Sequence, residues 1–206
     1  MVDPQTAYAS GTDGLLMGTT DGGAHWQLQM LKSGLIFFDI AFADARNGWA
    51  VGEFETIIHT SDGGKTWSTQ RGGTRADFKL PALFAVRFTD AQHGWVAGQG
   101  GTLLRTDNGG TNWQPFAAPS TAPMYSVAYV GGAPGSAPAE LWGSGDGGTL
   151  LRVTPGGSAA PSVQTPTVFG LADIAFQGQI GVAVGLSGTI LRTGDGGAHW
   201  QVVTGK

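Results

Sequence analysis

The sequence predicts an all-β fold, a β-propeller of four-stranded antiparallel blades, and three observations lead to it. One repeat recurs at two independent positions with the same spacing. Short alternating segments follow one another, and no stretch shows a sustained helical stripe. Glycines, 36 among 206 residues, punctuate these segments. Repeats of about 40–50 residues with four strands are typical of propeller blades.

The repeat length is the same at a downstream and at an upstream position. The downstream position ends a recurring turn phrase and reads Trp26, Trp67, Trp113, Ala160 and Trp200. The upstream position is aromatic or apolar and reads Tyr8, Trp49, Trp95, Trp142 and Val182. Both series advance by 41, 46, 47 and 40 residues. We therefore expect one domain over 1–206 with five repeats, approximately 1–31, 32–72, 73–118, 119–165 and 166–206.

Each repeat divides into four expected strands. In the second repeat they are "FDIAFAD", "GWAVG", "TIIHT" and a strand that begins at the turn Trp. Two insertions, 71–82 and 131–140, are expected to be surface loops. The first repeat opens at "TAYASG", which matches a second strand, so its first strand is missing. The chain is either a five-bladed ring that lacks one strand or a segment of a longer ring, and we favour the segment.

The phrase "TSDGGKTW" joins the third and fourth strands. An Asp early in a tight turn accepts backbone N–H bonds, and two glycines adopt positive φ at little cost. The same residue types suit a cation site, but Asn108 replaces the Asp in one copy and keeps only the acceptor. We therefore interpret the phrase as structural and expect no metal and no cofactor. Its members are Asp21, Trp26, Asp62, Trp67, Asn108, Trp113, Asp195 and Trp200.

These phrases resemble Asp-boxes, or bacterial neuraminidase repeats, with the pattern Ser/Thr-x-Asp-x-Gly-x-Thr-Trp. Thr60, Asp62, Gly64, Thr66 and Trp67 match it in full. Together with "NGWAVG" and "TIIHT", the unit is similar to the photosystem II stability/assembly factor-like family over nearly the whole chain. The resemblance implies a propeller of typically seven blades, outside the cytoplasm in the periplasm or lumen. It also implies a role in assembling a photosystem II core subunit, through an arginine patch that binds the client protein.

One position of the third strand aligns as a row of cationic residues. Through the five repeats it reads Gly18, His59, Arg105, Arg152 and Arg192. Guanidinium groups bind carboxylates with two hydrogen bonds, which suits a chain terminus of a client protein. The alternative is that each Arg lies across a neighbouring box Trp or pairs with a nearby Asp. The row as a whole is the predicted partner-binding site.

The 71–82 insertion is a second candidate contact. Arg71, Arg75 and Lys79 accompany one Asp, with Phe78 among them. It is either a partner-contact loop or a solvated insertion.

Composition excludes several functions. A net charge of −4 and a pI near 5.4 argue against nucleic-acid binding. No cysteine is present, so disulfides and thiol catalysis are excluded. No apolar run is long enough to span a membrane, and the N-terminus does not resemble a signal peptide.

An enzyme is not expected. Asp-box propellers include sialidases, which use three arginines, a Tyr–Glu pair and an Asp, but Tyr125 and Tyr129 have no Glu nearby in sequence. The three glutamates fall in expected turns or in the 131–140 loop, and the histidines lack metal-ligand spacing. The sequence therefore favours a non-enzymatic propeller that holds a client, by resemblance a membrane protein. A sialidase-like or glycan-binding propeller is the alternative.

Overall fold

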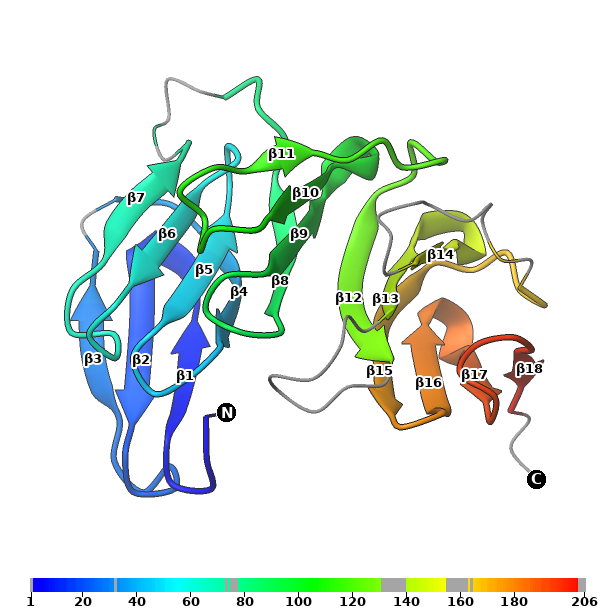
Figure 1. The fold of residues 1–206 in the computed structure, drawn as a ribbon, viewed down its shortest axis with the longest axis horizontal. Helices are drawn as coiled ribbons and strands as arrows, with labels where there is room; N and C mark the ends of the chain where they lie inside the picture. Colours follow the sequence, from blue (N-terminus) through cyan, green and yellow to red (C-terminus); the bar gives the residue numbers. More distant parts are fainter. Residues whose placement is uncertain are drawn as a thin grey trace. The chain divides into compact units, whose positions relative to one another are not determined.

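The structure is a computed structural model and describes residues 2–31, 33–72, 74, 78–130, 140–154, 163 and 165–203. Five antiparallel sheets of three or four strands make up this part of the chain, with short 3-10 turns and no α-helix among the described residues (Figure 1). This architecture is consistent with a propeller-like fold. The number of blades in the ring stays a prediction.

The sheets follow the order of the chain. The first sheet comprises β1 (Ala7–Ser10), β2 (Leu15–Thr19) and β3 (Gln27–Met30). The second comprises β4 (Phe37–Phe42), β5 (Gly48–Gly52), β6 (Ile57–Thr60) and β7 (Ser68–Arg71). The third comprises β8 (Leu83–Phe88), β9 (Gly94–Gly98), β10 (Leu103–Thr106) and β11 (Gln114–Pro115).

The last two sheets continue the series. The fourth comprises β12 (Met124–Val130), β13 (Glu140–Gly145) and β14 (Leu150–Val153), and Val163 adds an isolated bridge to Leu150. The fifth comprises β15 (Leu171–Gln177), β16 (Ile180–Gly185), β17 (Ile190–Thr193) and β18 (Gln201–Val202). In Figure 1 their colours run from green to red. The strand order within each sheet follows the sequence, as expected from the repeats.

The chain divides into two compact units. One comprises Met1–Val96 with Leu104–Gln114, and the other Ala97–Leu103 with Pro115–Lys206. The division passes through the third sheet, most of which belongs to the first unit. The expectation of a single domain stays a prediction.

Aromatic layers join consecutive sheets of the first unit. The Tyr8 ring stacks on Phe42 of the next sheet, with ring centroids 3.8 Å apart. Trp49 stacks on Phe88 in the same way at 3.5 Å. Each of these Phe rings also packs edge to face against the box Trp in the same sheet. For example, the ring centroids of Phe42 and Trp67 are 6.1 Å apart. The repeated aromatic position therefore packs one sheet on the next in this unit.

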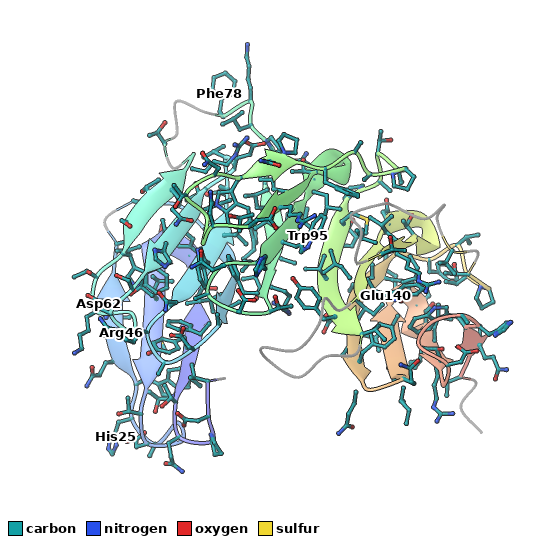
Figure 2. All side chains as sticks on the ribbon, in the orientation of Figure 1. His25, Arg46, Asp62, Phe78, Trp95 and Glu140 are labelled. Carbon is teal, nitrogen blue, oxygen red and sulfur yellow. The ribbon has the colours of Figure 1, made fainter. Side chains whose placement is uncertain are left out.

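The box turn satisfies its own hydrogen bonds. One oxygen of Asp62 accepts from the N–H groups of Lys65 and Thr66 at 3.0 and 2.9 Å, and the other accepts from the Thr66 hydroxyl at 2.7 Å. Gly63 and Gly64 have φ of 75° and 79°, which a side chain would disfavour. Figure 2 labels Asp62 and His25, which lie in the turns of the second and first sheets. These are the hydrogen bonds that the structural interpretation of the box expects, and the role of the box residues stays a prediction.

Two copies of the box carry His where the pattern has Thr. The ring Nδ1 of His25 lies 2.8 Å from the Asp21 carboxylate, and that of His199 lies 2.7 Å from Asp195. The imidazole thus takes the place of the Thr66 hydroxyl. Asn108 accepts the Asn112 N–H at 2.9 Å and so keeps the turn without a charge.

Acid is expected to weaken these turns. The backbone N–H of His25, with the Thr19 hydroxyl and the His25 ring, lowers the pKa of Asp21 to about 2 from 3.8. Hydrogen bonds from Thr66 and from His199 lower the pKa of Asp62 and Asp195 as well. A carboxyl with a lowered pKa in the folded state stabilises the fold above the unfolded pKa, and this stabilisation is lost as pH falls toward the folded value. The free energy of unfolding should therefore fall from about pH 4 to about pH 2.

Asp62→Asn provides the matched variant, because it copies Asn108. The amide keeps an acceptor that does not titrate, so the acid-dependent loss should be smaller than in the wild-type chain. Urea unfolding midpoints from about pH 5 to about pH 2 measure this difference. Identical pH profiles for the two chains would contradict the role of Asp62.

The fifth sheet has one uncovered apolar face. Val182, Val184 and Ile190 are 38, 40 and 40 % exposed. The equivalent residues of the fourth sheet, Trp142, Ser144 and Leu150, are completely buried. In the described part of this unit, β15 packs on the fourth sheet, and no further sheet packs on the fifth.

Candidate functional site

The predicted cationic row lies on the third strand of the second to fifth sheets, and its position in the first sheet is Gly18 on β2. Its members are His59 on β6, Arg105 on β10, Arg152 on β14 and Arg192 on β17. Each registered pair places the row beside the repeated aromatic position: Trp49 faces His59, Trp142 faces Arg152 and Val182 faces Arg192. Cross-strand partners project on the same side of a sheet, so each cationic residue lies next to that position.

In the first unit, both members of the row contact an aromatic ring. The His59 ring lies 4.7 Å from the Trp49 ring, and burial lowers the pKa of His59. Burial therefore favours the neutral imidazole of His59. The guanidinium carbon of Arg105 lies 5.8 Å from the Trp95 ring, and its Nε donates to Asp107 at 2.9 Å. Arg105 is still 38 % exposed.

In the second unit, the two arginines differ. Arg152 forms two hydrogen bonds with Glu140, one of them from Nε at 3.0 Å, and this pairing raises the pKa of Arg152. Arg192 is exposed and lines a hollow of about 340 Å³ with Asp195 and His199. Arg192 has no carboxylate partner within 4.0 Å among the described residues.

These arginines can bind carboxylates, but they differ in whether an existing ion pair must first be broken. Arg192 presents its guanidinium group directly to solvent. Arg105 and Arg152 must exchange their own carboxylates for an incoming one, and surface ion pairs are weak enough for such exchange. Arg105 and Arg152 are thus paired, as the second alternative of the sequence interpretation expects, and are still partly exposed. Partner binding by the row stays a prediction.

The 71–82 insertion differs from its prediction at its first residue. Arg71 belongs to β7, and its guanidinium group pairs with Glu55 at 2.6 Å. Lys79 lies 5.9 Å from the centre of the Phe78 ring, which is 68 % exposed (Figure 2). Arg75 lies outside the described residues. Lys79 and Phe78 therefore remain the candidate contacts of the described part of this loop.

The glutamates of the chain have structural contacts. Glu53 accepts the Ile36 N–H at 2.9 Å, and Glu55 pairs with Arg71. Glu140 was expected in a loop but begins β13, where β-pairing with Val130 holds it beside Arg152. Figure 2 labels Glu140 in this sheet. Among the described residues, no group of three or more His, Asp or Glu could hold a metal ion.

The sequence analysis did not predict the contacts of two acidic residues, each on the first strand of its sheet. Asp39 accepts the N–H of Val86 in the next sheet at 2.9 Å and pairs with Arg87. In the other unit, Asp173 accepts the Ser126 hydroxyl at 2.6 Å. The signal was visible, because "FDIAF" and "ADIAF" carry Asp at the same repeat position. These carboxylates join one sheet to its neighbour.

Comparison with known families identifies the repeat. The family described as "Photosynthesis system II assembly factor YCF48" matches residues 1–69 and 28–124, more than half of the chain. The chain belongs to this family. The resemblance that the Asp-boxes and "NGWAVG" indicate is thereby confirmed.

Curated members of the YCF48 family match short segments of the chain. "Photosystem II assembly lipoprotein Ycf48" of Synechococcus sp. (strain CC9902) is 30 % identical over 70 residues, which is 32 % of this chain and 21 % of the relative. The protein of the same name from Synechocystis sp. is 51 % identical over 43 residues, 20 % of this chain and 13 % of the relative. The matched segments thus span about a fifth or less of these relatives.

Solved structures share the fold over nearly the whole chain. "YCF48 bound to D1 peptide" is 21 % identical with a TM-score of 0.55, covering 98 % of this chain and 80 % of that one. The GH74 xyloglucanase from Xanthomonas campestris is 18 % identical with a TM-score of 0.72, covering 98 % and 37 %. At such identities the likeness shows the fold alone. Among the described residues, no helix is long and apolar enough to cross a membrane.

Proposed function

We propose that this chain is a non-enzymatic photosystem II assembly factor that holds a membrane-protein client while the client is assembled. Membership of the YCF48 family carries this proposal. A related structure contains a D1 peptide, and curated relatives are named assembly lipoproteins. The client is therefore an exposed segment or terminus of a photosystem II core subunit, bound outside the cytoplasm in the lumen or periplasm.

The third-strand arginines are the proposed contacts. Arg105, Arg152 and Arg192 are each partly or fully exposed and bring guanidinium groups suited to carboxylates. His59 contributes a neutral ring that can accept or donate a hydrogen bond. Phe78 and Lys79 on the 71–82 insertion add an exposed aromatic and a cation.

Fluorescence anisotropy tests the proposal with a labelled D1 peptide. Saturable binding is expected, weaker at high salt because exposed charges are screened. A peptide of scrambled sequence and one with an amidated C-terminus are the controls, and both should bind less tightly. Absence of binding, or equal binding of the scrambled peptide, would contradict the function.

A second assay separates binding from catalysis. A fluorogenic sialoside is expected to remain unhydrolysed in the presence of the chain. Release of the fluorophore, abolished by Arg105→Ala, would replace the assembly role by a sialidase activity.

A further inference from the structure

The first sheet carries a glycine where the other sheets carry His or Arg. Gly18 on β2 faces Tyr8 on β1, and this is the same cross-strand pair as His59 and Trp49 in the second sheet. A Cβ at position 18 would lie 3.0 Å from the Tyr8 ring. The first sheet therefore has the aromatic member of the pair without its cationic or imidazole neighbour.

Comparison of the two sheets shows which layer is missing. Trp49 contacts two rings, Phe88 at 3.5 Å and His59 at 4.7 Å. Tyr8 has the first of these layers, since Phe42 stacks on it at 3.8 Å and Gly63 accepts its hydroxyl at 2.9 Å. Gly18 supplies no side chain for the second layer.

A hollow of about 200 Å³ lies at this place. Tyr8 and Gly18 line it, together with Gly63 and Trp67 of the next box turn. All of these residues belong to the first compact unit. The hollow is thus bounded by two packed sheets.

We propose that this hollow binds an arginine side chain of a partner polypeptide. A guanidinium group would take the layer that His59 fills beside Trp49 and that Arg105 fills beside Trp95. A flat cation over an aromatic face is attracted by the ring, and it can donate hydrogen bonds in its own plane. The amide oxygens of Gln27 and Gln29 line the hollow as acceptors, although Gln29 already accepts from Trp67 Nε1 at 3.1 Å.

Three titratable groups line the hollow besides Tyr8. Asp21 contributes a carboxylate held by Thr19 and His25, His25 contributes its imidazole, and Lys65 contributes a cation. Lys65 repels a guanidinium guest, and its side chain is exposed. The proposal therefore predicts that removal of the Lys65 charge strengthens binding, whereas a carboxylate guest would bind less tightly after the same change.

The site does not depend on the proposed function. It recognises a cation, whereas the row of third-strand arginines recognises carboxylates. Its test uses a small probe and no D1 peptide, so each proposal can fail without the other.

NMR titration of the full chain with N-acetyl-arginine amide tests the site. The backbone N–H signals of Gly18, Thr19 and Gly64 should shift in a saturable manner, with a Kd in the millimolar range, about 1–10 mM, because one cation–π contact contributes little free energy. N-acetyl-citrulline amide has the same shape without the charge and should bind more weakly. Lys65→Gln should tighten arginine binding about threefold, since a nearby like charge is removed.

Variants that fill the hollow with a side chain provide the most direct test of the proposed site. Gly18→His places an imidazole as in the second sheet, and Gly18→Arg places a guanidinium as in the third. A Cβ there would lie 3.0 Å from the Tyr8 ring, so this ring must shift slightly in both variants. Both should abolish the titration while distant signals stay in place. Should either variant fail to fold, Tyr8→Phe keeps the ring and the binding. Absence of shifts in the wild-type chain, shifts that persist in a folded Gly18→His chain, or equal binding of citrulline amide would overturn the proposal.

Discussion

Replacing Trp49 with Ala is expected to lower the free energy of unfolding of the chain by about 3–5 kcal/mol, as truncation of a buried Trp leaves a large cavity. Trp49 is completely buried, stacks on Phe88, and donates from Nε1 to the Gly109 carbonyl at 3.3 Å. The substitution removes the ring that joins the second sheet to the third. Urea unfolding followed by circular dichroism and Trp fluorescence measures the loss.

Conservative variants at two equivalent positions provide the control. Trp49→Phe loses the hydrogen bond to Gly109 as well as ring area. Trp142 is also completely buried, but its Nε1 has no partner among the described residues, so Trp142→Phe loses ring area alone. Trp49→Phe should therefore be the more destabilising by about 1 kcal/mol. A Trp49→Ala chain as stable as wild type would contradict the packing described for these sheets.

Combined Arg105→Ala, Arg152→Ala and Arg192→Ala substitutions are expected to weaken D1-peptide binding about 100-fold. Hydrogen bonds to charged groups contribute about 1.5–3 kcal/mol each. We expect a contribution near or below the lower end of this range where an arginine must first leave its own carboxylate. That exchange applies to Arg105 with Asp107 and to Arg152 with Glu140. Titration of the labelled peptide by anisotropy gives the ratio of affinities.

A chain with Arg46→Ala controls for the loss of a cation. Arg46 lies outside the third-strand row, so its removal should weaken binding only through the general field, by less than the triple substitution. Arg192→Ala alone should leave stability unchanged, because Arg192 is exposed and unpaired among the described residues. A triple variant that binds the peptide like wild type would exclude the row as the contact surface.

The repeat made most of the fold predictable. Two positions with a constant spacing located five sheets, and the box residues indicated a turn that satisfies its own hydrogen bonds. The pairings of Arg152 and Arg71 could not be predicted, because their partners come from different elements. Glu140 reaches Arg152 from the neighbouring strand, and Glu55 reaches Arg71 from a turn.

Local sequence also did not indicate the hollow beside Tyr8. Gly18 was visible as the exception in the cationic row, but a missing side chain forms a hollow only when neighbouring residues stay in place around it. Here Gly63 and Trp67 of the next box turn line the hollow. That packing between sheets depends on tertiary contacts, which periodicity along one strand does not contain.

The most direct test of the proposed function follows the arginine side chains themselves. In a ¹⁵N-labelled chain, the Nε–Hε signals of Arg105, Arg152 and Arg192 should shift together as unlabelled D1 peptide is added, while that of Arg46 stays in place. This result would establish that the third-strand row receives the peptide. Saturable peptide binding without any change in these three signals would contradict the account, and the client would then have to bind elsewhere on the chain.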